Sequence, residues 1–193
     1  MNAILAPKSR RGILTAGATL SAAGALALMD LPARAAGKAA AGGNTAQDVQ
    51  LLNAALALED EGIAAYQIGA ESKLLTPDVL KVAVTFQGHH KTHRDDLIAA
   101  IKRLGGKPVE PKKLGDYAKE LNAASLKDQT GVLRLALKLE TGATNAYLGI
   151  IPSLGESDLY LLAARTAGDE AFHAGVLGHV LGVPVPQKAP LFG

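Results

Sequence analysis

The sequence predicts an all-α protein, a four-helix bundle with one long crossover between its second and third helices. Four long segments repeat apolar residues at steps of three and four, which is the spacing of one helix face. Ala and Leu fill most of these positions, and aromatic residues make up only 4% of the chain, which favours packed helices over sheets. The connection at residues 107–127 has the length of a crossover, whereas simple up-down bundles use short loops.

The first 35 residues carry the features of an export signal. A basic start contains Arg10 and Arg11, and an apolar stretch and an Ala-x-Ala cleavage signal follow it. The paired arginines resemble the twin-arginine export motif. We therefore expect a twin-arginine signal peptide over residues 1–35, cleavage near Ala35, a periplasmic location and the twin-arginine export machinery as a partner. A membrane anchor is the alternative, but the stretch is rich in small and hydroxyl residues and is marginal for spanning ~30 Å.

The composition of the remaining chain excludes several classes of function. Residues 1–35 hold 4 of the 20 basic and 1 of the 18 acidic residues, so 20 − 4 = 16 basic and 18 − 1 = 17 acidic residues remain. The formal charge changes from +2 to −1, and a nucleic-acid partner is not expected. Because the chain has no Cys, any metal must be bound through nitrogen and oxygen ligands.

The first helix is expected to follow a flexible linker at residues 36–44. Thr45 with Asp48 is predicted to cap its start, and no Gly or Pro cluster stops it before about Leu74. Glu59 is the one acid in its apolar stripe.

Three neighbours of Glu59 on this helix are assigned by their helical phase. Tyr66 lies two turns further along the same stripe. Asp60 and Glu61 turn towards the sides of the helix, so we expect them to face solvent.

The second helix is predicted from Pro77 to Leu104, because Pro is favoured at the first helical position and a pair of glycines follows the end. His90 and His93 lie on its inward stripe. His89 lies one position round, at the edge of that stripe.

The crossover at residues 107–127 is expected to hold one short helix at residues 116–124. The third long helix is predicted at residues 128–151, where a proline follows. Its inward stripe again has a single acid, Glu140, and Tyr147 lies two turns further along it.

The fourth helix is predicted at residues 157–182, before a Pro-rich tail at residues 183–193. Glu170 and His173 share its apolar face, and a carboxylate buried there is costly unless it is paired or bound to a cation. Glu-x-x-His on an inward face is the half-site of dimetal helical bundles.

A weak repeat relates the two halves of the bundle. The matched pairs are Glu59 and Tyr66 with Glu140 and Tyr147, and His90 and His93 with Glu170 and His173. Over residues 45–182 the chain thus resembles the ferritin-like superfamily, in particular exported bacterial ferritin-like domain proteins. The resemblance implies a metal centre with five ligands, Glu59, His93, Glu140, Glu170 and His173, and the inward stripe of the second helix adds His90 as the sixth.

Position 90 departs from the family pattern, which has a Glu that bridges two metal ions there. An imidazole cannot bridge in that way, so both a dimetal centre bridged mainly by Glu170 and a mononuclear or asymmetric centre stay open. Three carboxylates and three imidazoles favour Fe, Mn, Zn or Cu over Mg or Ca, and we expect iron first.

Three further residues are candidates for supporting the ligands from outside. Tyr66 and Tyr147 either donate to a ligand carboxylate on a neighbouring helix or are core tyrosines bonded to any nearby carbonyl. His89 is a candidate for the same supporting position or for the edge of the site.

The sequence favours an exported ferritin-like metal-binding protein that acts on oxygen or peroxide, and it leaves open whether the protein is an enzyme. The alternatives are a non-enzymatic metal carrier or store, and a structural, stress-related bundle with a vacant site. The chain after Gly182 is too short for the further helix of cage-forming ferritins, so we expect a monomer or homodimer.

Overall fold

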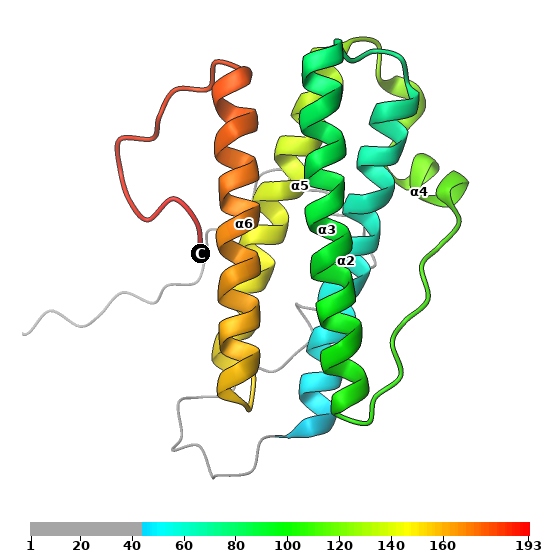
Figure 1. The fold of residues 1–193 in the computed structure, drawn as a ribbon. Helices are drawn as coiled ribbons and strands as arrows, with labels where there is room; N and C mark the ends of the chain where they lie inside the picture. The colour runs from blue at the N-terminus through cyan, green and yellow to red at the C-terminus, as the bar shows by residue number, and fades with distance from the viewer. Residues whose placement is uncertain (1–43) are drawn as a thin grey trace, which may run out of the picture.

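The structure is a computed structural model that describes residues 44–193. The predicted signal peptide and the linker up to residue 43 lie outside the described residues. In the described part, five α-helices and two short 3-10 helices occur without any strand. Four long helices form a bundle in which one long crossover joins the second to the third (Figure 1). The predicted fold class is confirmed.

The first bundle helix, α2, spans Thr45–Glu71, three residues short of the predicted end. Its N-cap is Asn44, whose side chain accepts a hydrogen bond from the Gln47 amide, so the predicted Thr45 cap is wrong by one residue. Asp48 instead accepts a hydrogen bond of 2.9 Å from the Gly155 amide and ties the start of α2 to the loop that precedes the last bundle helix.

The second bundle helix, α3, spans Pro77–Arg103 and begins with the predicted proline. Gly105 follows its end with φ of +76°, a conformation that glycine adopts without steric cost. Helices α2 and α3 pack against each other along their length as an antiparallel hairpin.

The crossover contains α4 (Leu114–Glu120) and the 3-10 helix η1 (Ala123–Ser125) in place of the single predicted helix. The break falls at Asn122, which has a left-handed φ of 51°. Because α4 packs against α2, the crossover covers part of its side. Asp60 and Glu61 are therefore buried, at 6% and 4% exposure, and the prediction that they face solvent is wrong.

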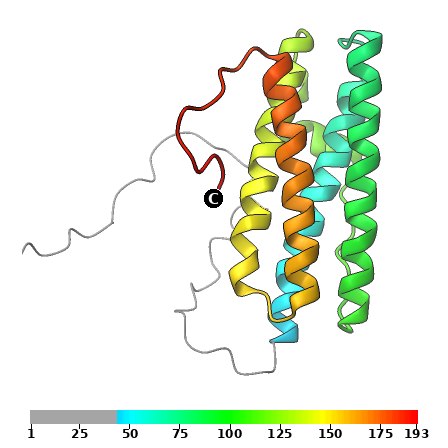
Figure 2. The same cartoon turned by 60° about the vertical axis from the view of Figure 1, so that its left-hand side comes forward.

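The second hairpin consists of α5 (Gln129–Ile150) and α6 (Ser157–Val180), joined through η2 (Ile151–Ser153). Asp128 caps α5 by accepting a hydrogen bond of 2.8 Å from the Gly131 amide. Figure 2 shows α5 and α6 side by side, with α2 and α3 as the other pair. All four long helices end within three residues of the predicted positions.

Two apolar clusters fill the bundle, one towards each end. The cluster at the end where α2 starts includes Leu52, Leu56, Leu97, Ile101, Leu159 and Ala163. The cluster at the opposite end contains Tyr66, Ala83, Phe86, Leu133 and Leu177. Between these two clusters, at mid-length, the helices bury polar side chains.

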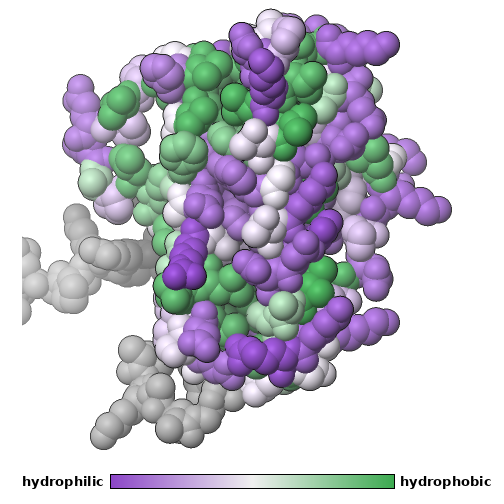
Figure 3. Space-filling view, viewed as in Figure 1, coloured by the Kyte–Doolittle hydropathy of each residue, from purple (hydrophilic) through white to green (hydrophobic). Residues whose placement is uncertain are grey.

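The outer surface is mixed. Hydrophilic side chains cross the middle of the face formed by α3 and α6, with hydrophobic ones above and below (Figure 3). The tail after α6 is mostly exposed, and the Gly193 amide donates to the Asn145 side chain at 2.8 Å. Among the described helices, none has the length and apolar character needed to cross a membrane.

Candidate metal centre

Each of the four long helices contributes at least one polar side chain to a cluster at mid-length. The six residues predicted as ligands all meet there and are at most 7% exposed: Glu59, His90, His93, Glu140, Glu170 and His173. Each lies on an otherwise apolar stripe, so the same 3.6-residue period that buries the leucines also points these side chains inward. Their role as metal ligands stays a prediction.

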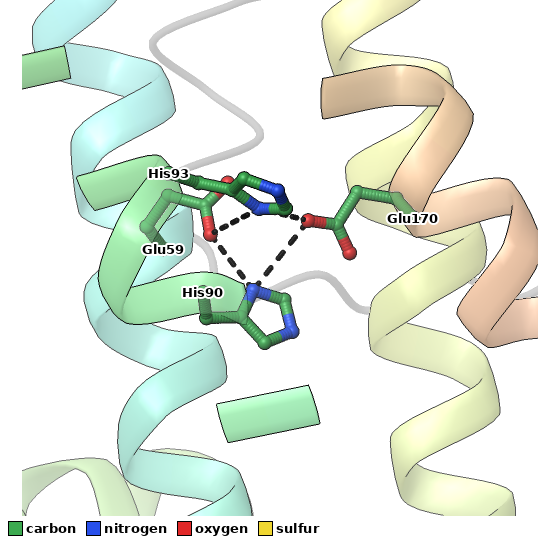
Figure 4. Close-up of side chains that lie close together, drawn as sticks. All are labelled: Glu59, His90, His93 and Glu170. Atoms are coloured by element: carbon green, nitrogen blue, oxygen red, sulfur yellow. Dashed lines mark hydrogen bonds and ion pairs between the residues drawn. The ribbon is translucent and has the colours of Figure 1, made fainter. Parts of the chain in front are cut away.

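One group of potential ligands consists of Glu59, His90, His93 and Glu170, whose ligand atoms all lie within 4.8 Å of one another (Figure 4). The Oε2 atom of Glu59 lies 2.7 Å from Nδ1 of His90 and 3.6 Å from Nδ1 of His93. Oε1 of Glu170 lies 3.0 Å from Nδ1 of His93. Two carboxylates and two imidazole nitrogens therefore face one small volume.

A second group consists of His90, Glu140, Glu170 and His173, again within 4.8 Å. Oε1 of Glu140 lies 3.3 Å from Nε2 of His90. Nδ1 of His173 lies 3.4 Å from Glu140 and 3.3 Å from Glu170. We call the first set the His93 group and this one the His173 group.

The two groups share His90 and Glu170. The His90 ring stands between them, with Nδ1 facing Glu59 and Nε2 facing Glu140. A neutral imidazole has only one nitrogen with a free lone pair, so His90 can ligate in one group at a time.

Two tyrosines connect the halves of the bundle through the cluster. Tyr66 on α2 donates its hydroxyl hydrogen to Glu140 on α5, and Tyr147 on α5 donates to Glu59 on α2. Both hydroxyls thus bond to a carboxylate on the neighbouring helix, which was one of the two alternatives left by the sequence. These bonds fix the orientation of the two carboxylates.

His89 lies outside the cluster, on the exposed side of α3. Its Nδ1 atom is 2.9 Å from Nε2 of His173, so it holds the outer nitrogen of a ring whose inner nitrogen faces the carboxylates. The ring of Phe86 stacks on His173 with centroids 4.0 Å apart, a contact that the sequence alone did not indicate.

Residues 47–183 match the sequence family described as ferritin-like domain, which is more than half of the chain. The chain belongs to this ferritin-like domain family. The ferritin-like match spans nearly all of the four long helices, and therefore all six clustered side chains.

Comparison with solved structures agrees on the fold. The ferritin-like chain is similar to a crystal structure described as a conserved hypothetical protein from Mycobacterium tuberculosis, with a TM-score of 0.61 and 23% identity. The alignment covers 75% of this chain and 98% of that one. No curated protein matches the sequence significantly.

The cluster of this ferritin-like protein balances its own charge when no cation is bound. Burial lowers the pKa of His90, but its bonds to Glu140 and Glu59 outweigh that effect and the net shift is well above the ordinary value. His93 shifts in the same direction, to a pKa of about 10, because Glu170 and Glu59 oppose its desolvation. Burial raises the pKa of Glu59, yet the neighbouring His90 and His93 bring it below its usual range. Imidazolium and carboxylate forms therefore stabilise each other.

Glu170 is the exception among the carboxylates. Its burial and the neighbouring Glu140 carboxylate raise its pKa, even though His173 and His93 act in the opposite direction. Both Glu170 oxygens and Nδ1 of His93 are buried and make no hydrogen bond, although Oε1 faces that Nδ1 at 3.0 Å and Oε2 faces Nδ1 of His173 at 3.3 Å. Buried polar atoms left in this way are costly, and a cation between them would satisfy all three. The donor set therefore fits a metal ion.

The cluster approaches the surface on the α3 and α6 side. A polar depression of about 390 Å³ is lined there by residues that include His89, His93, Asp96, Arg165 and Asp169. At its base, Nε2 of His93 lies 3.1 Å from Oδ2 of Asp169, whose side chain is 61% exposed. Sequence reasoning missed Asp169, because it lies beside Glu170 but off the inward stripe and only the fold brings it to His93.

Proposed function

We propose that this ferritin-like protein is exported and binds a redox-active transition metal in the described cluster, where it acts on oxygen or peroxide. The observation that carries the proposal is the convergence of buried ligand atoms on one volume: Oε1 of Glu170 and Nδ1 of His93 make no hydrogen bond, and they face each other at 3.0 Å beside Glu59 and His90. Three carboxylates buried in an apolar bundle are costly unless positive charge balances them, and a metal ion would supply that charge in place of the protonated imidazoles.

We assign the first ion to the His93 group, because Nδ1 of His93 makes no hydrogen bond, faces the carboxylates of Glu170 and Glu59, and belongs to this group alone. One ion should be held firmly and a second one weakly, since neutral His90 offers its lone pair to only one group. Two carboxylates and two imidazoles suit iron or manganese better than magnesium or calcium, and we expect iron.

A bound iron or manganese ion would supply one-electron chemistry with oxygen or peroxide. The protein's own groups prepare the site for it. Tyr147 and Tyr66 orient Glu59 and Glu140, and the apolar clusters at both ends keep bulk water from the bundle interior. The exposed carboxylate of Asp169 gives a hydrated cation or peroxide a polar route to His93.

Export is supported by the basic start, apolar stretch and cleavage signal within residues 1–35. Replacing Arg10 and Arg11 together by lysine should retain the uncleaved chain in the cytoplasm, as shown by cell fractionation and immunoblotting. Cleavage and periplasmic recovery of that double variant would contradict the twin-arginine route.

Metal content measured on protein purified from its own compartment tests the central proposal. We expect about one iron or manganese per chain in the wild type, and a large loss in Glu170→Gln and His93→Ala. Glu71→Gln is the matched control, because Glu71 is an exposed acid at the end of α2. Equal metal content in all variants would overturn the site.

Activity is tested on the same samples by following peroxide consumption after anaerobic loading with Fe(II). We expect consumption by the wild type and the Glu71→Gln control, and none by Glu170→Gln. Bound metal without any consumption would instead support a carrier or store.

A further inference from the structure

An apolar cavity of about 260 Å³ adjoins the cluster on the side away from the polar depression. Its inner wall is formed by Tyr66, His90 and Glu140. His90 and Glu140 belong to the His173 group. Almost all of its other lining residues are aliphatic and come from the end of the bundle where α3 starts and α6 ends. The volume exceeds that of an engineered cavity of about 150 Å³ that binds benzene.

The cavity is elongated along the bundle axis. On α3 its wall runs from Asp78 to His90, and Leu75 extends it beyond the start of that helix. On α2 it runs from Leu58 to Gly69, which is three helical turns or about 16 Å. A modest volume spread over that length suits an extended aliphatic ligand rather than a compact cyclic one.

Small residues keep this space open. Gly62, Ala65, Gly69, Ala83 and Ala136 all line the cavity. A Cβ atom at Gly62 would lie 3.1 Å from the His90 ring, and one at Gly69 would lie 3.1 Å from Val132. These glycines let α2 approach its neighbours closely, while the two alanines Ala83 and Ala136 leave room where a larger apolar side chain would fill the interior.

The charge of the wall restricts the ligand. Its ionisable residues are the acids Glu61, Asp78 and Glu140 together with His90 and Tyr66, and neither Lys nor Arg lines it. A carboxylate or phosphate head group at the inner wall would meet the carboxylate of Glu140, because the two nitrogens of His90 already face Glu59 and Glu140. An uncharged hydroxyl or carbonyl could reach this wall without that repulsion.

We propose that this cavity binds an uncharged, unbranched aliphatic molecule with one polar end, such as a medium-chain alcohol or aldehyde, placed with that end towards Tyr66, Glu140 and His90. This inference rests on the proposed function, because it names the class of molecule on which the metal centre would act. The binding itself requires no metal, so it can be tested separately.

The test is calorimetric titration of the metal-free full-length protein with decan-1-ol. Decanoate has the same chain length but a charged end, and cyclohexanol has the same hydroxyl on a compact body. We expect saturable binding of decan-1-ol at one site per chain, with decanoate and cyclohexanol at least about tenfold weaker.

Two variants fill the cavity from different helices, Ala83→Leu and Ala136→Leu. Each should weaken decan-1-ol binding by about tenfold or more while metal content stays at the wild-type level. Ala99→Leu is the matched control on α3, because Ala99 is exposed and does not line the cavity. Circular dichroism identifies any variant that fails to fold, in which case the other one decides.

Three outcomes would overturn the inference: no binding by the wild type, unchanged binding by the folded cavity variants, or decanoate bound as tightly as decan-1-ol. None of these outcomes bears on the proposed metal site, because that proposal is tested separately by metal content. Conversely, a wild type that binds decan-1-ol but no metal would leave the cavity assigned and the proposed function refuted.

Discussion

At the scale of single residues, His90 decides what the cluster can hold. A carboxylate at this position could offer one oxygen to each of two ions, whereas the His90 ring offers one nitrogen to either group and can protonate. Its Nδ1 and Nε2 atoms contact Glu59 and Glu140, so it takes up space and charge that a second cation would otherwise use.

His90→Ala should lower metal affinity about 10- to 100-fold, as weakened metal shells do. His89→Ala should reduce metal affinity several-fold less than His90→Ala does, because His89 is exposed and reaches the cluster only through the outer nitrogen of His173. Competition with a chromogenic chelator measures both constants. A larger loss from His89→Ala would mean that His89 is the ligand on α3.

His90→Glu should raise the metal stoichiometry from about one towards two ions per chain, since the new carboxylate can reach both groups. The folded, metal-free variant should be less stable than the wild type, because four clustered carboxylates then face two histidines. Elemental analysis and thermal unfolding measure the two effects. A stoichiometry unchanged at one would refute the assignment of His90 as the limiting residue.

The metal-free protein should lose stability as pH rises from 7 to 10. The pKa of His93 is about 10 in the fold, against an ordinary value of 6.5, and that of His90 is also raised. Their stabilising contribution is complete below 6.5 and is lost as pH rises through the folded pKa. Thermal unfolding in chelator should show the decline, and His93→Gln should show less of it.

Metal affinity should follow pH in the opposite sense over the same range. Imidazolium must lose its proton before it can ligate, so binding releases protons and strengthens as pH rises. A wild-type melting temperature that climbs with pH in chelator would contradict the charge-balanced cluster.

At the scale of the helices, the sequence predicted which residues face the bundle interior. It predicted less well where each helix ends and which residues on its sides become buried. One acid in an apolar row placed Glu59 and Glu140 in the interior, because helical period alone fixes the phase. The burial of Asp60 and Glu61 was not predictable, since it depends on where a crossover without regular periodicity packs. The same holds for Asp169, which only the approach of α3 to α6 brings to His93.

Tyr66→Phe and Tyr147→Phe should each destabilise the metal-free protein by about 1–3 kcal/mol, because each removes the hydroxyl donor of a buried carboxylate. Chemical denaturation measures the free energy of unfolding. Tyr160→Phe serves as the control, because its ring is 40% exposed and its hydroxyl bonds only a backbone carbonyl. Losses no larger than in this control would show that the crossed bonds contribute little.

At the scale of the whole molecule, we expect a monomer or homodimer, which stays a prediction. The described chain after α6 is an exposed tail without a further helix. Light scattering should show a monomer of 19.8 kDa, or less after cleavage, or its dimer. A mass of several hundred kilodaltons would refute this.

The repeat gives the molecule a broken twofold symmetry. Exchanging the two hairpins matches Glu59 with Glu140. It also matches the two tyrosines with each other and His93 with His173, but it sets His90 against Glu170, a residue of different chemistry. The two hollows beside the cluster differ as well: mostly polar residues line the depression beside His93, and mostly aliphatic residues line the cavity beside Glu140. A hydrated cation or peroxide would consequently reach the cluster through the polar depression, and an aliphatic molecule through the apolar cavity. The two kinds of molecule need not compete for one entry.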